Sequence, residues 1–274
     1  MISASGLRLS GSVATPVVTD LAAGVRWRTM AVFAQAAYLL GDQRHDQVVA
    51  LLAPDALQLP IGVRVPGHLG DLRRHFQVGD LAHSTGRDLV FDRDGQVCVQ
   101  IGLGGRHQPS AVTVRGGWPC HEWHGDLPGV DPVLRARAGL LAQALSVGDD
   151  SGVGELVGWG QGLTPTGDDL VCGVLLALIA TGTITRDQAR HVIEDHSHRT
   201  TSISARLLRS AAEGHAVPQV VALVDALLTS PAAVPPALVG AVHAIGHSSG
   251  RDLCAGLAGA LDHLHHDQSV TVHH

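Results

Sequence analysis

The sequence predicts an α+β protein, in which a β-rich N-terminal part precedes a mostly α-helical C-terminal part. Between residues 17 and 114 the aliphatic segments are short and interrupted by Gly, Pro, Asp and His. After a Pro/Gly/Trp-rich segment at 116–132, apolar residues recur with a helical period of 3.6. The 274 residues are 45% apolar, 16% charged and only 3% aromatic, a composition typical of globular proteins with an Ala/Val/Leu core. We expect a β-rich domain at 1–130, a helical domain at 131–264 and a frayed polar tail at 265–274.

Several short runs of the N-terminal part have the composition of strands. Residues 88–92 and 97–101 alternate apolar and polar positions around Arg93-Asp94-Gly95, which is typical of a β-hairpin. Residues 62–66 and 111–114 are further expected strands. The alanines of 28–40 suit a helix, but the position of this segment among strands favours a strand.

The C-terminal part has the apolar spacing of successive helices. Asp131 and Pro132 are typical of a helix start, with Asp as the cap and Pro in the first helical position. The apolar run 170–180 is about half of the roughly 20 residues that cross a bilayer, so it predicts a buried helix and no membrane partner. We expect helices at 131–147, 168–181, 185–198, 201–213, 217–229, 235–245 and 251–264.

Charge and composition exclude several functions. With 19 basic and 25 acidic residues the net charge is −6, which argues against nucleic acid as a partner. Every basic residue is Arg, and the chain has neither Lys nor Asn, which excludes a Schiff-base lysine and a P-loop lysine. An anion site must therefore use Arg, hydroxyls or backbone N–H groups. The four cysteines are scattered and the first residues lack a secretory pattern, so we expect a cytoplasmic protein.

The most informative motif is Gly158-Trp159-Gly160-Gln161-Gly162-Leu163-Thr164-Pro165-Thr166-Gly167-Asp168-Asp169, directly before the apolar run. Its glycines permit a close approach of the backbone, its threonines offer hydroxyls, and the helix start offers unpaired N–H groups with a positive dipole. Together they predict a loop that binds an anion. A capping box formed by Thr166 and Asp169 is the alternative, although it explains neither the glycines nor Asp168.

A second motif, Gly246-His247-Ser248-Ser249-Gly250-Arg251-Asp252, has the same pattern at an offset of 83 residues. Both contain a hydroxyl residue, Gly, any residue, Asp, Leu and a later Gly, namely Gly173 or Gly256. If the match is not a coincidence of helix-start composition, the two helix starts converge on one ligand. The two later glycines would then let the helices approach closely.

A third motif, at 198–208, has four hydroxyls in five residues and two arginines. Thr200, Thr201 and Ser204 are candidates to line a polar pocket, with Arg199 or Arg206 providing positive charge for a carboxylate or phosphate. Ordinary helix caps and a solvated arginine face are the equally weighted alternative.

These three motifs together resemble the AllH-like domain family, which includes a subunit associated with the oxamate carbamoyltransferase of allantoin catabolism. The resemblance covers residues 155–260, and Thr166 stands where serine is common in the family. It implies a role in moving a carbamoyl group between carbamoyl phosphate and a small acid such as oxamate. It also implies that other protein subunits act with this chain.

Histidines and carboxylates raise the question of a metal. His191, Asp195 and His198 share a helix face, for which a solvated surface is the favoured interpretation and a zinc site the alternative. Cys120-His121-Glu122-Trp123-His124 lacks the spacing of a zinc helix, so a loop with a buried tryptophan is expected there. Asp168 and Asp169, with Asp252, are candidates for holding magnesium against a phosphate.

We therefore expect an enzyme or enzyme subunit that binds a small anionic metabolite between two helix starts. Candidates for proton transfer or metal binding are Asp168, Asp169 and His247, the last because histidine titrates near neutrality. The expected substrate-binding residues are Gly160, Gly162, Thr164, Thr166, Gly167, Arg199, Thr200, Thr201, Ser204, Ser248, Ser249, Gly250 and Asp252, and Arg206 or Arg251 are further sources of charge. The rivals are a non-catalytic binding or assembly subunit and a metal-dependent hydrolase built on the histidines.

Overall fold

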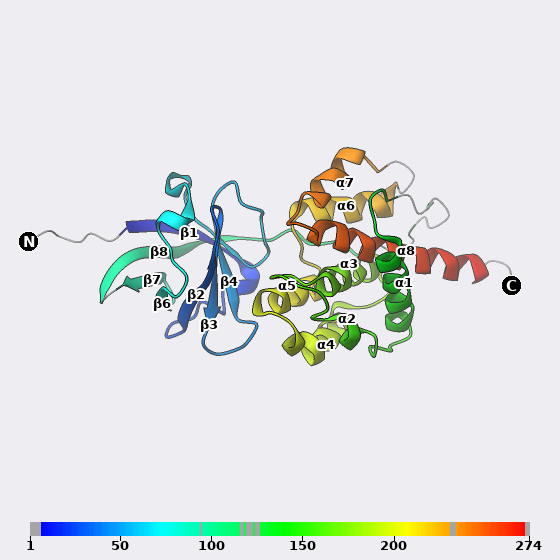
Figure 1. Cartoon of the computed structure of the whole chain (residues 1–274), viewed down its shortest axis with the longest axis horizontal. Helices are drawn as coiled ribbons and strands as arrows, with labels where there is room; N and C mark the ends of the chain where they lie inside the picture. The colour runs from blue at the N-terminus through cyan, green and yellow to red at the C-terminus, as the bar shows by residue number, and fades with distance from the viewer. Residues whose placement is uncertain are drawn as a thin grey trace, which may run out of the picture. The chain divides into compact units, whose positions relative to one another are not determined.

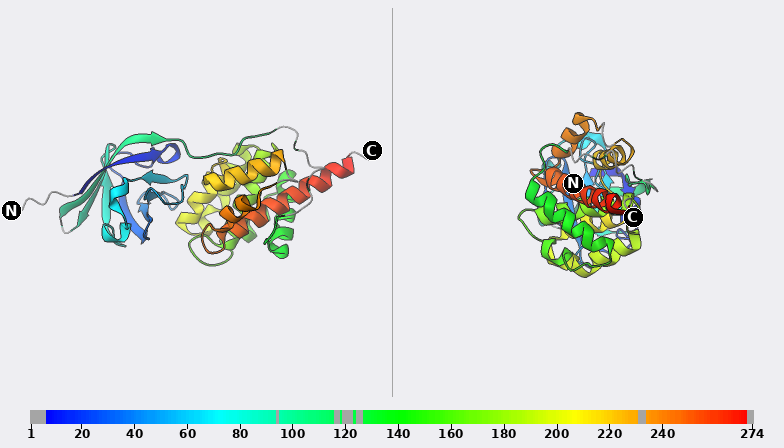
Figure 2. Two further views of the ribbon diagram at one scale, coloured as in Figure 1. Left: turned by 90° about the horizontal axis from the view of Figure 1, so that it is seen from above. Right: turned by 90° about the vertical axis from the view of Figure 1, so that its right-hand side faces the viewer.

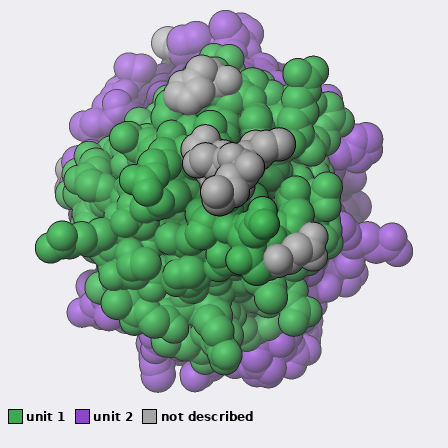
Figure 3. Space-filling model, turned by 90° about the vertical axis from the view of Figure 1, so that its left-hand side faces the viewer, with its two compact units in different colours: residues 1–109 green, residues 110–274 purple. Residues whose placement is uncertain are grey.

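The computed structural model describes residues 7–93, 95–115, 118, 123, 127–230 and 234–271, without the side chains of residues 68 and 268–271. The chain divides into two compact units, residues 1–109 and 110–274 (Figure 3). As the sequence predicts, the first is rich in strands and the second in helices. Residues 110–115 belong to the helical unit because Val112 N donates to Gly214 O at 2.8 Å and Arg115 N to Ala180 O at 2.8 Å.

The first unit is a closed barrel with the strand order β1-β5-β4-β3-β2-β6-β7-β8 (Figure 1). Parallel pairing of β1 with β8 closes it, and β4 and β5 are also parallel, while the other neighbours are antiparallel. The bulkiest fully buried side chains of this unit are Trp27, Phe76 and Phe91. The strands are β1 (Leu7–Ala14), β2 (Arg26–Val32), β3 (Ala36–Gly41), β4 (Val48–Leu52), β5 (Gly62–Arg64), β6 (Leu81–Ser84), β7 (Asp88–Arg93) and β8 (Gln96–His107).

The local strand predictions hold for most of this unit. The hairpin of β7 and β8 forms with Arg93 opposite Gln96, and Gly95 takes the positive φ of 78° that its turn requires. Residues 28–40 are strand rather than helix, although they fold as parts of two strands, β2 and β3, paired with each other. The segment 62–66 contains β5.

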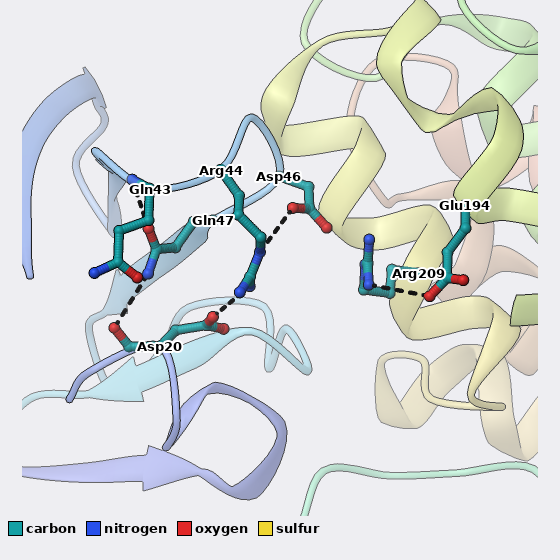
Figure 4. A network of polar contacts seen from close by, with 7 residues as sticks. All are labelled: Asp20, Gln43, Arg44, Asp46, Gln47, Glu194 and Arg209. Atoms are coloured by element: carbon teal, nitrogen blue, oxygen red, sulfur yellow. Dashed lines mark hydrogen bonds and ion pairs between the residues drawn. The ribbon is translucent and has the colours of Figure 1, made fainter.

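Polar side chains brace the loop before β4. The Arg44 guanidinium contacts the carboxylates of Asp20 at 2.7 Å and Asp46 at 3.4 Å, and Gln47 Nε2 donates to Asp20 O at 3.4 Å (Figure 4). Asp20 and Asp46 are buried. Because an unpaired buried carboxylate is costly, these contacts compensate for the burial of both groups.

The second unit is built from helices, shown from green to red in Figures 1 and 2. All seven predicted helices are present, and the capping prediction at the first is confirmed because Asp131 accepts hydrogen bonds from Val133 N and Leu134 N. The helices are α1 (Pro132–Ser146), α2 (Val153–Leu156), α3 (Thr166–Ala180), α4 (Arg186–His196), α5 (Ser202–Ala212), α6 (Pro218–Thr229), α7 (Pro236–His243) and α8 (Ser249–Thr271).

The apolar helix α3 is the core of this unit. Every residue from Gly167 to Ala180 is buried, as the uninterrupted apolar run predicts. No helix in the described ranges is long and apolar enough to cross a lipid bilayer.

Two predictions of secondary structure are wrong. Residues 111–114 make one isolated bridge, between Ala111 and His215, and no strand, because these residues bond to the ends of helices and find no extended neighbour. The tail is not frayed from residue 265, because α8 continues to Thr271 and extends past α1 and α3 (Figure 2). No Gly or Pro follows Gly259 in the sequence of this helix, so no residue there favours an earlier helix end.

Candidate functional site

The glycine-rich loop that joins α2 to α3 is held in a conformation that only glycine adopts readily. Gly158, Gly160 and Gly162 have φ values of 82°, 112° and 95°. Residues 159–163 are exposed. Within the described residues, the N–H groups of Gly160, Gln161 and Gly162 donate no backbone hydrogen bond. The loop therefore presents several free donors to solvent.

The first turn of α3 is not closed by a side chain. Pro165 is the N-cap residue, and no side chain caps the helix, so the capping box of Thr166 with Asp169 does not form. The reason is that the helix begins one residue earlier than a Thr166 cap requires, which places Thr166 in the first turn itself. The hydroxyl of Thr166 is thus left for another partner.

The second loop repeats this geometry at the offset of 83 residues. At α3, Asp168 N and Asp169 N donate to Pro165 O at 3.0 and 3.2 Å. At α8, Arg251 N and Asp252 N donate to Ser248 O at 2.8 and 3.0 Å. The repeat extends to glycine packing, because a side chain on Gly167 would overlap Leu156 O and one on Gly250 would overlap Val242 O.

The two equivalent helices touch through their later glycines. A Cβ on Gly173 would lie 2.9 Å from Gly256 Cα, and a Cβ on Gly256 would lie 2.9 Å from Gly173 Cα. Such close backbone approach is possible only without side chains. The repeat in the sequence is therefore also a repeat in the structure. Each of the two helix starts precedes the same crossing point in its own helix.

The two loops meet through their hydroxyl groups, a contact that the sequence predicts only if the repeat is not a coincidence. Thr164 Oγ1 and Ser249 Oγ are 2.9 Å apart and form a hydrogen bond between positions 85 residues apart. Both hydroxyls also hydrogen-bond the carboxylate of Asp169. One residue from each motif thus contacts the same acidic side chain.

The threonine motif joins the same cluster. Thr200 Oγ1 donates to Asp168 Oδ2, while Gly158 N donates to Asp168 Oδ1 at 2.7 Å. Ser204 provides a further hydrogen bond to Asp168. Thr201 Oγ1 donates to Leu163 O at 2.6 Å and accepts from Ser204 N at 3.1 Å, so one side chain caps α5 and holds the glycine loop. The carboxylate of Asp168 therefore links the first and third motifs by hydrogen bonds.

Burial makes this cluster electrostatically unusual. Desolvation raises the pKa of Asp169 to about 7, against hydrogen bonds from Ser249 and Thr164 that lower it, and the nearby Asp252 and Asp168 charges raise it further. Desolvation likewise raises the pKa of Asp168, although its three hydrogen bonds oppose the shift. Burial, together with the Asp169 and Asp168 charges, raises the pKa of the Cys172 thiol. Asp169 is therefore able to exchange a proton near neutral pH.

The arginines proposed to balance charge lie in different places. Arg199 is exposed, and its carbonyl packs against Gly158 beside the loop. Arg251 is exposed in the first turn of α8. Arg206 is buried within α5. The pKa of Glu213, the residue after α5, is lowered mainly by a hydrogen bond with His215, and the charge of Arg206 lowers it further. The structure thus places Arg199 and Arg251 beside the two loops, whereas Arg206 acts on a different carboxylate.

The remaining candidates of the second loop face solvent. His247 and Ser248 are exposed between α7 and α8, while Asp252 is buried in the first turn of α8. No hydrogen bond of the His247 ring appears among the described residues. His247 is therefore free to meet a ligand or a partner at this surface.

The histidine clusters do not form a metal centre in the described residues, where no group of three or more His, Cys, Asp or Glu side chains is placed to hold an ion. His191, Asp195 and His198 are exposed, which fits the solvated face. Trp123 is buried, as expected of the 120–124 loop, and donates to Asp262 Oδ1 at 2.9 Å; residues 120–122 and 124 lie outside the described ranges.

Sequence reasoning missed two parts of the cluster. The backbone N–H of Gly158 and the carbonyl of Leu163 hold Asp168 and Thr201, although neither residue was a site candidate. The positive φ of Gly158 is signalled by the spacing of glycines, but a carbonyl acceptor such as that of Leu163 carries no signal in its side chain.

One comparison with known proteins finds a match in this region. Residues 156–261 match the family model described as oxamate carbamoyltransferase subunit AllH, so this part of the chain is similar to AllH-like domains. The matched range begins at the end of α2 and includes all three motifs. Comparisons with curated proteins and with solved structures find no match to the chain.

Proposed function

Because residues 156–261 are similar to AllH-like domains, we propose that this chain is an enzyme subunit in carbamoyl transfer and binds a small anionic substrate at the N-terminal ends of α3 and α8. The observation that carries this proposal is the 2.9 Å hydrogen bond between Thr164 and Ser249. It joins two loops of the same pattern, each of which precedes a helix N-terminus. Two helix dipoles then favour negative charge at one place.

The free donors around the loops are suited to a phosphate or carboxylate. The exposed N–H groups of Gly160 to Gly162 and the Thr166 hydroxyl donate to no described residue. Arg199 and Arg251 bring positive charge to the two loops from the exposed side. In a chain without lysine, this combination of backbone donors, hydroxyls and guanidinium groups is the available means of binding an anion.

The proposed reaction is transfer between carbamoyl phosphate and a small acid such as oxamate. The acceptor nitrogen attacks the carbamoyl carbon, the new C–N bond forms as the C–O bond to phosphate breaks, and phosphate leaves. The nitrogen must also lose a proton, for which Asp169, with a pKa of about 7, and the exposed His247 are the candidate acceptors. Asp168 positions the loop by holding Gly158 and Thr200.

Thermal unfolding tests binding without assuming turnover. We expect phosphate or carbamoyl phosphate to raise the melting temperature, since a ligand at 100 times its Kd adds about 2.7 kcal/mol to the native state. Oxamate and oxalurate test whether the site also binds a carboxylate. Thr166→Ala should weaken the shift, whereas Thr229→Ala, a hydroxyl deletion at the end of α6, should not. If none of the four anions shifts the wild-type melting temperature, the proposal of an anion site fails.

A second candidate function is a non-catalytic assembly subunit, which an apolar surface on α1 favours. Val133, Leu140 and Val147 are 62, 68 and 80% exposed at a spacing of seven residues along and just after α1. Arg137 of the same helix stacks on Trp159, 4.9 Å from its ring centre, which places the glycine loop beside this surface. Seven-residue apolar spacing is suited to contact with another helix. Anion binding without any product from the purified chain would favour this function over catalysis.

A further inference from the structure

We propose that the carboxylates of Asp169 and Asp252 bind a hard divalent cation at the crossing of α3 and α8, with the hydroxyls of Thr164 and Ser249 as neighbouring oxygen donors. Asp169 and Asp252 occupy equivalent places in the two helices, each four residues before the crossing glycine of its helix. The proposal narrows the three carboxylates that the sequence offers as magnesium candidates, Asp168, Asp169 and Asp252, to the last two.

The first reason is that each carboxylate keeps one buried oxygen without a partner. The Oδ2 atoms of Asp169 and Asp252 have no hydrogen bond among the described residues. The two side chains belong to residues that are only 8% and 6% exposed, so water cannot freely replace the missing partners. A buried carboxylate oxygen with no partner costs several kcal/mol in proteins.

The second reason is that negative charges meet here. Asp168, Asp169 and Asp252 are all buried in the first turns of α3 and α8, whose starts are joined by the hydrogen bond between Thr164 and Ser249. Asp168 cannot relieve this by binding a cation, because Gly158, Thr200 and Ser204 already bond its carboxylate. Asp169 and Asp252 are therefore the pair left to bind a positive ion.

The donor atoms select the class of cation. Two carboxylates and two hydroxyls are hard oxygen ligands, which suit Mg²⁺ or Ca²⁺ rather than Zn²⁺. The nearby Cys172 is not a competing ligand, because sulfur is a soft donor and these cations prefer oxygen. Mg²⁺ is commonly held by one or two carboxylates, with water or substrate oxygens in its other positions. This is consistent with the lack of a third carboxylate or histidine ligand in the described residues.

This inference deepens the proposed function, on which it rests in part, because a cation would neutralise the carboxylates that otherwise repel an anion at the same two helix starts. The two ideas are nonetheless separable. Cation binding is measured with metal alone, in the absence of phosphate and carboxylate ligands. Failure of one measurement then leaves the other intact.

The test is thermal unfolding and calorimetric titration of the full chain after treatment with a chelator and its removal. We expect Mg²⁺ or Ca²⁺ chloride to raise the melting temperature by about 5 °C at a hundred times Kd. Calorimetric titration of the same samples measures the Kd of each cation directly.

Three isosteric variants make the assignment specific. Asp169→Asn and Asp252→Asn should each abolish the metal-dependent rise, while both proteins remain folded because Asn matches Asp in shape. Asp195→Asn removes an exposed carboxylate of α4 and should keep the full rise. The proposal is overturned if neither cation shifts the wild type at 10 mM, a concentration on the order of the weakest protein Ca²⁺ sites or above. An equal shift in all four proteins also overturns it.

Discussion

Gly173 and Gly256 face each other where α3 and α8 cross, each so close to the other helix that a Cβ on either would come within 2.9 Å of the other's Cα. The same Cβ atoms would also overlap the carbonyl oxygens of Leu253 and Leu170. This contact fixes the separation of the two helix starts. The geometry of the loops that precede the two helices therefore depends on the absence of a side chain at both glycines.

Gly173→Ala or Gly256→Ala should destabilise the protein by about 3 kcal/mol or more, because backbone atoms cannot move aside as side chains do. Urea unfolding measures the change. The matched control is Gly240→Ala on the exposed face of α7, where a Cβ meets nothing within 4 Å. That change should stabilise the helix by up to about 1 kcal/mol. Equal effects of the alanines at 173 and 240 would contradict the close crossing.

The stability of the metal-free protein should fall between pH 4 and pH 7. The pKa of Asp169 is raised to about 7 in the folded chain, against 3.8 for an ordinary Asp, so the folded state binds more protons in this range. The stabilisation is complete below pH 3.8 and is lost as the pH rises through 7. Asp169→Asn should flatten this part of the profile and raise stability at pH 8. A profile that the substitution leaves unchanged would contradict the burial of an ionisable carboxyl here.

The hydrogen bond between Thr164 and Ser249 should couple the two loops energetically. We expect Thr164→Val, Ser249→Ala and the double variant to give a coupling energy of about 1 kcal/mol in a double-mutant cycle. Denaturant unfolding provides the four stabilities. Additive effects of the two substitutions would show that the loops are neighbours without a shared interaction.

Asp262 should stabilise the C-terminal helix α8 through two partners. Arg135 of α1 contacts both carboxylate oxygens, at 2.5 and 2.6 Å, and Trp123 donates to Oδ1 at 2.9 Å. Asp262→Ala should cost about 1–3 kcal/mol, because the charged partner loses two hydrogen bonds. Asp187→Ala breaks the exposed pair with Arg190 on α4 and should cost less than about 0.5 kcal/mol. Urea unfolding of both variants compares the two ion pairs.

Patterns in the sequence predict those elements of the fold that are determined by residues close together in the chain. The hairpin of β7 and β8, the Asp131 cap and the buried helix α3 follow from turn residues, capping chemistry and apolar content near each position. The repeat at an offset of 83 also indicates the approach of Gly173 and Gly256, because helices with glycine at their contact can pack closely.

Long-range pairing is where prediction from the sequence stops. Closure of the barrel joins Leu7 to Val99 in parallel, and no local signal indicates this partner. Residues 111–114 have strand composition but bond to helix ends instead. Within the candidate site, the sequence indicates the acidic residues but not which of them is already bonded, so the distinction between Asp168 and Asp252 requires the structure.

Calorimetric titration of carbamoyl phosphate into Gly162→Ala and Gly148→Ala tests the central claim most directly. Both glycines have positive φ, 95° and 83°, and a Cβ on either meets nothing within 4 Å, so both substitutions strain the backbone alike. Only Gly162 belongs to the loop joined to Ser249. The account predicts that Gly162→Ala weakens binding at least tenfold while Gly148→Ala binds as the wild type does. Equal affinity in all three proteins would contradict an anion site formed by the two converging loops.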